Sequence, residues 1–312
     1  MSTFGSSAYG GAGWSERTDS HRAEIGTLWR GGIDSEWRRL KTVLLCRPGA
    51  ELAVNDANAN QFLEPLDLGR AQAEHDRLAE IYRAEGIETL VTPEVEAPPP
   101  NRMFCADQMV LTPEGAILAR PASTVRAGEE IAVALALANH HVPILKTLTG
   151  RATFEGADLM WLDAETAIIG RGLRTNQAAI EKITALLAEI GCTTLAVDMP
   201  FGTMHLMGML RIADEDLAIA WPRRTPHAVV TALRDRGMEV AFLPNEDEAA
   251  ANRGLNFVTL GPRRILMPGN NATMRAFYER LGIEVHETPM DELKKAAGAI
   301  GCLTGVIERD RA

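Results

Sequence analysis

Cysteines are few in this sequence and show no metal-binding or disulfide pattern. The 312 residues include four cysteines, and no two of them form a Cys-x-x-Cys pair. Neither a zinc site nor a disulfide framework is therefore indicated. We expect a protein that uses no metal ion and no other cofactor and that resides in a reducing cytoplasm.

A basic excess is also missing. Asp and Glu number 42 against 32 Lys and Arg, which gives a formal net charge of -10. Nucleic acids and anionic membranes bind basic surfaces, so we expect neither as a partner. The negative charge favours attraction of a small cationic molecule instead.

Long apolar runs are absent as well. No stretch approaches the length of a membrane span, and the first 24 residues have neither the basic start nor the apolar run of a signal peptide. Residues 1–25 are rich in Gly and Ser, which favours a flexible N-terminal arm, with a lid over a site as the alternative. Residues 26–312 are expected to form a single domain.

What the sequence does contain is a repeat. Apolar strands flank turns such as Pro113-Glu114-Gly115, and each such hairpin is followed by an amphipathic helix and a further strand, over about 50 to 60 residues. We expect hairpins at 103–121, 159–172, 205–221 and 257–269, and helices at 67–86, 127–141, 176–191, 225–237 and 271–282. Repeats of this length predict an α/β propeller, because modules that cannot bury their faces alone close around an axis.

Residues capable of catalysis lie at comparable places in these repeats. They are the carboxylates Asp107 and Glu155, then His205, and finally Cys302 in the small-residue stretch "GAIGCLTG". A cysteine nucleophile needs a histidine partner, and that histidine needs a carboxylate to orient it. We therefore expect these side chains to meet at the axis. The alternative is that Cys302 only packs, since free cysteine is a small hydrophobe.

Four segments taken together resemble a known superfamily. They are "FCADQMVLTPEGAILARP", "ATFEGADLMWLDAETAIIGRGLRTN", "MHLMG" and "GAIGCLTG", in that order. Together they are similar to the guanidine-modifying, amidinotransferase-like superfamily, which includes dimethylarginine dimethylaminohydrolases, arginine deiminases and glycine amidinotransferases. The resemblance implies a five-bladed pentein α/β-propeller of ββαβ-type repeats.

The resemblance also implies catalytic roles. Cys302 would be the nucleophile that attacks the central carbon of a guanidinium or amidinium group. His205 would protonate the leaving nitrogen and then activate the water that hydrolyses a covalent thiouronium intermediate. Glu155 would orient this histidine. The implied activity is hydrolysis of a C–N bond, like that of dimethylarginine dimethylaminohydrolase.

Substrate-binding roles follow from the same resemblance. Asp107 would bind the planar cationic head of the substrate, in which two N–H donors meet two oxygens. Arg126 and Arg174 would hold a substrate carboxylate, although ordinary ion pairs are the alternative for both. Asp158 would contact substrate or, equally, hold the "EGAD" turn through hydrogen bonds.

Two departures from the superfamily pattern bear on the substrate. Met207 stands where deiminases and amidinotransferases carry an aspartate, and Ala106 stands where many dimethylarginine hydrolases carry a second acid. A substituted guanidine or an amidine therefore suits the site better than free arginine. The alternatives are an amidinotransferase, with an amine as acceptor, and a non-catalytic pentein binding protein. A homodimer is the commonest default for the assembly.

Overall fold

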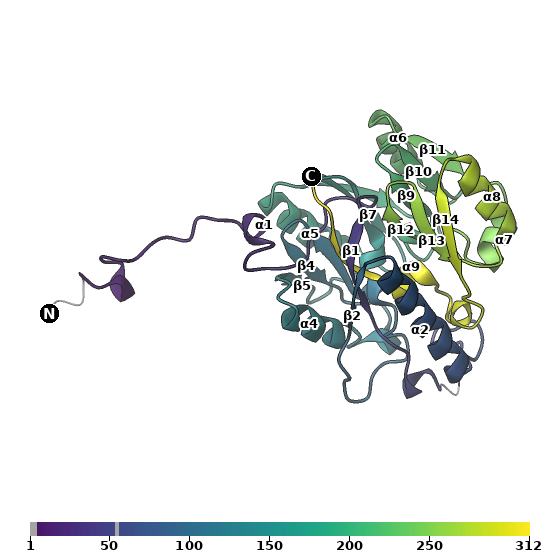
Figure 1. Cartoon of the computed structure of the whole chain (residues 1–312), viewed down its shortest axis with the longest axis horizontal. Coiled ribbons are helices and arrows are strands. Elements are labelled where there is room, and N and C mark those ends of the chain that lie inside the picture. The colour runs from purple at the N-terminus through teal and green to yellow at the C-terminus, as the bar shows by residue number, and fades with distance from the viewer. Residues whose placement is uncertain (1–4, 54–55) are drawn as a thin grey trace.

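The computed structural model of the chain describes residues 5–53 and 56–312, which form five three-stranded sheets (Figure 1). The strands are β1 (Leu40–Leu45), β2 (Glu88–Val91), β3 (Met109–Thr112), β4 (Gly115–Leu118), β5 (Ile144–Thr147), β6 (Leu159–Asp163), β7 (Thr166–Arg171), β8 (Thr193–Asp198), β9 (Leu210–Asp214), β10 (Leu217–Ala220), β11 (Glu239–Phe242), β12 (Val258–Gly261), β13 (Arg264–Pro268), β14 (Glu284–Thr288) and β15 (Gly305–Arg309).

Helices connect and cover these sheets. They are α1 (His21–Glu24), α2 (Leu68–Ala84), α3 (Cys105–Gln108), α4 (Glu130–Asn139), α5 (Gln177–Glu189), α6 (His227–Asp235), α7 (Glu246–Ala251), α8 (Ala272–Arg280) and α9 (Ile300–Leu303). The 3-10 helices η5 (Gly156–Asp158) and η6 (Leu206–Gly208) precede β6 and β9. Side chains accept hydrogen bonds at several helix starts, as Asp67 does from the backbone of Arg70 at 2.8 Å.

Each sheet has the same topology. A first strand pairs antiparallel with the central strand, and a helix then leads to a third strand that pairs parallel with the central one, as in β3, β4, α4 and β5. One blade is assembled from both ends of the chain: β15 is the first strand beside β1, and α2 and β2 follow (Figure 1). The expected ββαβ propeller is confirmed.

The blades form a closed ring. Contacts join β15 to β3, β3 to η5, β6 to η6, β9 to β12, and β12 back to β1. The first strand of each blade thus lies against its neighbours. The connections that lead into these first strands therefore gather around the axis.

The four expected hairpins and five expected helices are present, with slightly narrower bounds. Six of the strands and α-helices were not expected: β5, β15, α1, α3, α7 and α9. Strand β5 has one half-buried and three exposed residues, so it shows no apolar alternation. The helices α3 and α7 are too short for a helical period, and β15 is recognisable only through its distant partner β1.

The core consists of apolar side chains between blades and under the helices. Trp161 is fully buried, and its indole N–H donates to the backbone oxygen of Leu111 in the preceding blade at 3.0 Å. Helix α2 buries one face, including Leu78 and Tyr82, against the sheet of β1. The Tyr82 hydroxyl lies 2.7 Å from that of Thr304, just before β15.

The described part of the N-terminal arm extends away from the propeller (Figure 1). Residues 5–20 are almost entirely exposed, and Arg17 forms an ion pair with Glu24 at the arm's root. None of the described helices combines the length and the apolar character needed to span a membrane.

Candidate active site

The five connections around the axis each contribute one polar side chain. Asp107 lies in α3, Glu155 directly precedes η5, His205 directly precedes η6, Asn256 precedes β12, and Cys302 lies in α9. Every one of these segments leads into the first strand of a blade. The topology therefore brings together residues that are about 50 positions apart in the sequence.

Glu155 and Asp107 lie on either side of the His205 ring. The Nε2 atom of His205 is 2.7 Å from Oε2 of Glu155, and its Nδ1 atom is 3.8 Å from Oδ1 of Asp107. All three residues are buried. The Asp107 oxygen Oδ1 has no hydrogen-bond partner among the described residues, so it is a buried acceptor with an unused lone pair.

Two arginines lie against these carboxylates. Arg126 donates through Nη1 to both Asp107 and Glu155 at 2.9 Å, and it forms a two-pronged pair with Glu129. Arg174 donates through Nη1 to Oε1 of Glu155 at 3.1 Å. Both arginines thus form ion pairs within the protein, which was the alternative to binding a substrate carboxylate. Arg126 is bound to three carboxylates at once.

The charges of this cluster shift its pKa values. Burial by itself lowers the pKa of His205, but Asp107 and Glu155 outweigh burial and raise it to about 9. Burial opposes ionisation of Glu155, yet Arg126 and His205 hold its pKa well below the usual range. Burial raises the pKa of Glu129 to about 7 in spite of its pairing with Arg126. His205 is therefore a protonated acid near neutral pH.

Cys302 is held by Asn256. The Asn256 amide donates from Nδ2 to Sγ of Cys302 at 3.0 Å, and its Oδ1 accepts from the backbone N–H groups of Gly301 and Cys302 at 2.7 and 3.3 Å. Burial and the Asp107 carboxylate raise the pKa of the Cys302 thiol, and the Asn256 hydrogen bond opposes them. A bound cation would favour the thiolate.

Glycines permit the close packing of these segments. A Cβ atom on Gly156 would lie 2.0 Å from the backbone oxygen of Met109 and 2.6 Å from that of Ala106. The connection that carries Glu155 thereby packs directly on the one that carries Asp107. A Cβ atom on Gly301 would lie 1.9 Å from Nη2 of the buried Arg211.

The carboxylate of Asp158 is engaged in hydrogen bonds within the protein. Its carboxylate accepts from the Thr175 hydroxyl at 2.6 Å and from the backbone N–H of Leu206 at 3.0 Å. Burial raises its pKa to about 6. One oxygen thus holds the segment that follows His205, and the other holds Thr175, which follows Arg174. Of the two roles that the sequence left open for Asp158, substrate contact and structural hydrogen bonding, these contacts fit the second.

One group of side chains has the geometry of a metal site. Among the described residues, Asp107, Glu155 and His205 offer ligand atoms within 4.8 Å of one another. Arg126 and Arg174 already lie on these carboxylates, however. A divalent ion would have to displace two buried cations, so this donor set fits a metal poorly.

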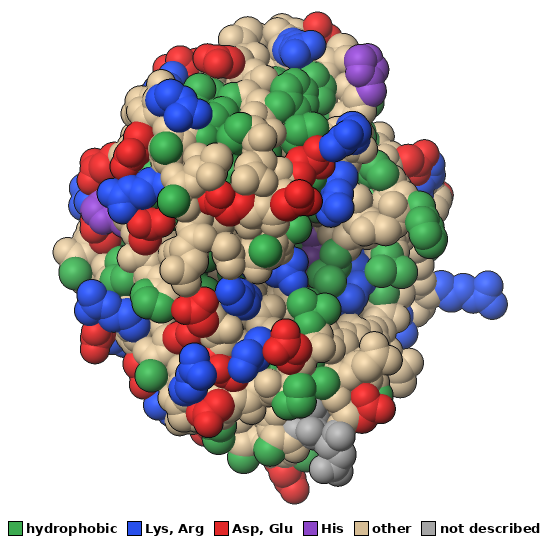
Figure 2. Space-filling view, turned by 90° about the vertical axis from the view of Figure 1, so that its right-hand side faces the viewer, with side chains coloured by type: hydrophobic (Ala, Val, Ile, Leu, Met, Phe, Trp, Pro, Cys, Tyr) green, Lys and Arg blue, Asp and Glu red, His purple; other side chains and the backbone are tan. Residues whose placement is uncertain are grey.

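A cavity with two lobes reaches His205 and Cys302. The inner lobe, about 20 Å³, is lined by Asp107, Arg126, Arg174, Phe104 and Asn101. The outer lobe, about 290 Å³, is lined by Met207, Met209, Trp221, Arg224, Arg253 and Leu255. Both lobes share Met204, His205, Ala297 and Cys302. Figure 2 shows a hollow near the centre of one face, where a histidine lies among hydrophobic and basic side chains.

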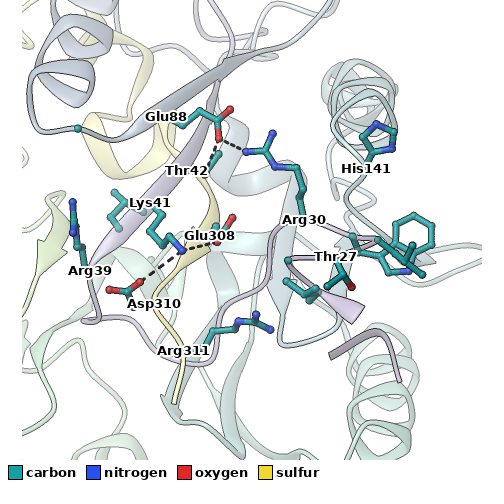
Figure 3. Close-up of a pocket in the computed structure, with 16 residues that line it drawn as sticks. Thr27, Arg30, Arg39, Lys41, Thr42, Glu88, His141, Glu308, Asp310 and Arg311 are labelled. Carbon is teal, nitrogen blue, oxygen red and sulfur yellow. Dashed lines mark hydrogen bonds and ion pairs between the residues drawn. The ribbon is translucent and has the colours of Figure 1, made fainter. Parts of the chain in front are cut away.

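A larger cavity, about 890 Å³, lies elsewhere, between residues 25–30, the start of β1 and the end of β15 (Figure 3). Its charged side chains largely pair with one another, as Lys41 does with Glu308 at 3.0 Å. Since Cys302 precedes β15, this cavity lies at the opposite end of that strand. It contains none of the predicted catalytic residues.

Sequence reasoning missed Asn256 and Glu129. Asn256 stands 46 positions before Cys302 and 51 after His205, close to the spacing of the other axial residues. That spacing is the sequence signal that could have identified Asn256. The sequence offered no such signal for Glu129, because an acidic residue at a helix start is ordinarily a surface residue that interacts favourably with the helix dipole.

Comparisons with known proteins agree with this geometry. Residues 93–225 match the family model of arginine deiminase. The dimethylarginine dimethylaminohydrolase of Streptomyces coelicolor is 27% identical over 85% of this chain and 96% of its own length. The arginine deiminase of Listeria welshimeri is 25% identical over 68% of this chain and 63% of its own length.

Solved structures share the fold. A DDAH variant from Pseudomonas aeruginosa, complexed with citrulline, superposes with a TM-score of 0.71 at 21% identity and covers 87% of this chain and 100% of its own. An amidinotransferase of saxitoxin biosynthesis from Microseira wollei superposes with a TM-score of 0.76 at 15% identity, covering 90% and 98%.

Proposed function

We propose that this chain, which is similar to members of the guanidine-modifying pentein superfamily in sequence and fold, is a cysteine-dependent hydrolase of a C–N bond in a guanidino or amidine compound. The observation that supports this most strongly is the convergence of Asp107, His205 and Cys302 on one cavity, with Glu155 bound to the His205 ring. A purely binding protein would not need a nucleophile and a protonated histidine together.

The first step forms a covalent intermediate. Asp107, with its unpaired oxygen, orients the planar head of the substrate, and the positive charge of that head favours loss of the Cys302 thiol proton to solvent, which gives the thiolate. The sulfur attacks the central carbon and forms a C–S bond. His205 gives its proton to the departing nitrogen as the C–N bond breaks, while Glu155 holds the ring.

The second step restores the enzyme. Neutral His205 takes a proton from water, and the hydroxide adds to the thiouronium carbon. The C–S bond then breaks, Cys302 leaves as a thiolate, and a ureido or amide product forms. Met207, which is apolar and lines the outer lobe, favours a substituted amine over ammonia as the first leaving group.

Exchange of cysteine for serine tests the nucleophile. Cys302→Ser should abolish turnover of any guanidino substrate while circular dichroism stays unchanged, because a hydroxyl is far less ionised than a thiol. Cys46→Ser, at a buried cysteine that lines neither lobe of the cavity, serves as the matched control and should keep its activity. Turnover by Cys302→Ser would refute the covalent mechanism.

An amidinotransferase is the second candidate, because the outer lobe lies beside His205 and Cys302 and has room for an amine acceptor. Turnover in oxygen-18 water, with and without added glycine or lysine, separates the two reactions. A hydrolase places one heavy oxygen in the product and is indifferent to the amine. Formation of a new guanidino compound in proportion to the amine, without label, would replace the hydrolase proposal with the transferase.

A further inference from the structure

Arg211, in strand β9, is a buried cation that the proposed mechanism does not use. Its side chain is only 7% exposed, and no Asp or Glu of the described residues forms an ion pair with it. Its Nη2 atom is buried and has no hydrogen-bond partner within residues 5–53 and 56–312. An arginine stays positively charged in proteins, and a buried charge without a counterion is strongly unfavourable. The position of Arg211 is therefore favourable only if a negative group forms nearby.

Arg211 lies against the two residues that directly precede Asn256 and Cys302. Its Nε atom donates to the backbone oxygen of Leu255 at 3.2 Å. Its Nη2 atom is so close to the Gly301 backbone that a Cβ atom on Gly301 would be 1.9 Å from it. Arg211 lines neither lobe of the cavity, so its guanidinium approaches the turn that carries the Cys302 thiol from the protein interior.

Neighbouring side chains hold the guanidinium in this place. The Cζ atom of Arg211 lies 5.9 Å from the centroid of the Phe257 ring, which in turn makes an edge contact with the ring of Tyr278. Arg211 thus contacts the residue on each side of Asn256, whose amide donates to the Cys302 sulfur. The cation and the thiol are therefore attached to the same short segments.

The groups that could neutralise Arg211 are few. Burial lowers the pKa of Arg211, and four ionisable groups oppose this effect. In decreasing order of effect they are Cys302, Glu36, Tyr278 and Tyr82. Burial raises the pKa of both tyrosines, so neither phenol is negative near neutral pH. One oxygen of Glu36 already accepts a backbone N–H group at 3.0 Å, and burial raises its pKa too. A Cys302 thiolate is therefore the strongest counterion available.

The other cations near Cys302 are already paired. Those that line the inner lobe with it are Arg126, Arg174 and His205. All three contact the carboxylate of Glu155. Strand β13 also packs against α9, and its one charged residue, Arg264, is paired with Glu284 at 3.1 Å.

Negative charge also faces the thiol. Burial and the Asp107 carboxylate in α3 raise the pKa of Cys302, whereas the Asn256 amide and Arg211 lower it. Among the described cations around Cys302, Arg211 is the one without a bound carboxylate. Its charge is therefore the one that is not already cancelled by an anion.

We propose that Arg211 is a positioning residue whose buried charge stabilises the Cys302 thiolate from within the protein, before any substrate binds. The thiol proton leaves to solvent, and Arg211 keeps its own protons. Residue 301 has to be glycine in this arrangement, because a side chain there would displace the guanidinium. This inference rests on the proposed function, since it concerns the nucleophile of that reaction.

The pH dependence of Cys302 alkylation by iodoacetamide, followed by peptide mass spectrometry, tests the proposal without a substrate. The neutral variants Arg211→Met and Arg211→Gln should move the midpoint upward by about one pH unit, which slows alkylation at pH 7.5 about tenfold. Arg211→Lys keeps the charge and should stay much closer to wild type. Well above both midpoints the rates should converge, because the thiolate is then fully formed in every variant.

Arg309→Met is the matched control. Arg309, in β15, is also a buried arginine, and it donates to the backbone oxygens of Arg38 and Thr259 at 2.7 and 2.8 Å. It lines neither lobe of the cavity. We expect this variant to lose stability as the Arg211 variants do, but to keep the wild-type midpoint.

Two results would overturn the inference. One is a neutral variant of Arg211 with the wild-type midpoint. The other is alkylation slowed equally at every pH, which would show that Arg211 only holds the turn. If neither neutral variant folds, Gly301→Ala decides in their place, because its Cβ atom displaces the guanidinium and should raise the midpoint. Alkylation requires no turnover, so a chain that hydrolyses no guanidine would contradict the proposed function and still allow this test.

Discussion

At the scale of single residues, Asn256 is the residue that holds Cys302, the proposed nucleophile, through hydrogen bonds. Its amide contacts the Cys302 sulfur and also the two backbone N–H groups at that turn. A neutral donor at 3.0 Å from the sulfur of the half-buried Cys302 favours the thiolate, because a hydrogen bond to a charged group is stronger than one to a neutral group. Asn256 is thus a positioning residue that also affects ionisation.

Substitution of Asn256 should raise the pKa of Cys302. We expect Asn256→Ala to slow alkylation by iodoacetamide about tenfold at pH 7.5 and to move its pH midpoint upward. Asn256→Asp keeps the acceptor for the backbone but replaces the donor with a negative charge, so it should be slower still. Equal pH profiles of alkylation for Asn256→Asp and wild type would show that Asn256 acts only by positioning the backbone.

His205 should make stability depend on pH. Its pKa in the folded protein is about 9, above the ordinary value of 6.5, since Asp107 and Glu155 outweigh burial. Its protonated form therefore stabilises the fold fully below about pH 6.5, and this contribution is lost as the pH rises through about 9. Urea unfolding of wild type and His205→Asn should differ by about 1–3 kcal/mol at pH 6 and by much less at pH 10.

A difference between those two proteins that stays constant, or grows with pH, would contradict the proposed ionisation of His205. The difference in unfolding free energy between wild type and His205→Asn is the quantity to follow, because Glu129 and Asp158 also titrate, with pKa values of about 7 and 6. Both groups are present in each protein.

At the scale of elements, the site depends on close contact between short connections. Glu155 and Asp107 come from adjacent blades, and the backbone of η5 lies directly on that of α3 and β3. Only a residue without a side chain allows this approach at Gly156. The distance between the two carboxylates is therefore set by backbone packing.

Gly156→Ala should be strongly destabilising. The added methyl group would lie 2.0 Å from a backbone oxygen that has no rotamer to move to. We expect a loss of about 3 kcal/mol or more in the free energy of unfolding, together with reduced turnover. Gly69→Ala, at an exposed position in α2 with 3.4 Å of space, should instead stabilise by about 0.5–1 kcal/mol. An unfolding free energy of Gly156→Ala close to wild type would refute this account.

At the scale of the whole molecule, the ring is closed by the two ends of the domain. The first strand of the blade that contains β1 is β15, the last strand of the chain. Cys302 lies in α9, immediately before this closing strand. Cys302, the proposed nucleophile, therefore reaches the site only when the ring is complete, which couples folding of the domain to assembly of the site.

The arm lies outside this ring. Its described residues are exposed and extend away from the propeller, and none lines either lobe of the cavity (Figure 1). We expect deletion of residues 1–16, which keeps the Arg17–Glu24 pair, to leave kcat/KM and Tm unchanged. A fall in kcat/KM with unchanged Tm would instead favour the lid that the sequence left open.

Local features of the sequence determined most of the helices and strands, and they identified the candidate site residues along the chain. Apolar alternation with turn residues located the four hairpins, and helical periodicity located the five long helices, because these signals depend on neighbouring residues. The repeat spacing, together with the resemblance, led to Cys302, His205, Glu155 and Asp107. The structure brings the last three into contact and places Cys302 on the same cavity.

Tertiary structure alone decided the contacts between distant segments. The pairing of β1 with β15 joins residues more than 250 positions apart, and no local pattern encodes such a partner. The three carboxylates on Arg126, the amide on Cys302 and the basic lining of the outer lobe likewise depend on which side chains converge at the axis. Hydrogen bonds and charges act over a few ångströms in space, so the sequence could name the residues of the site but not their partners.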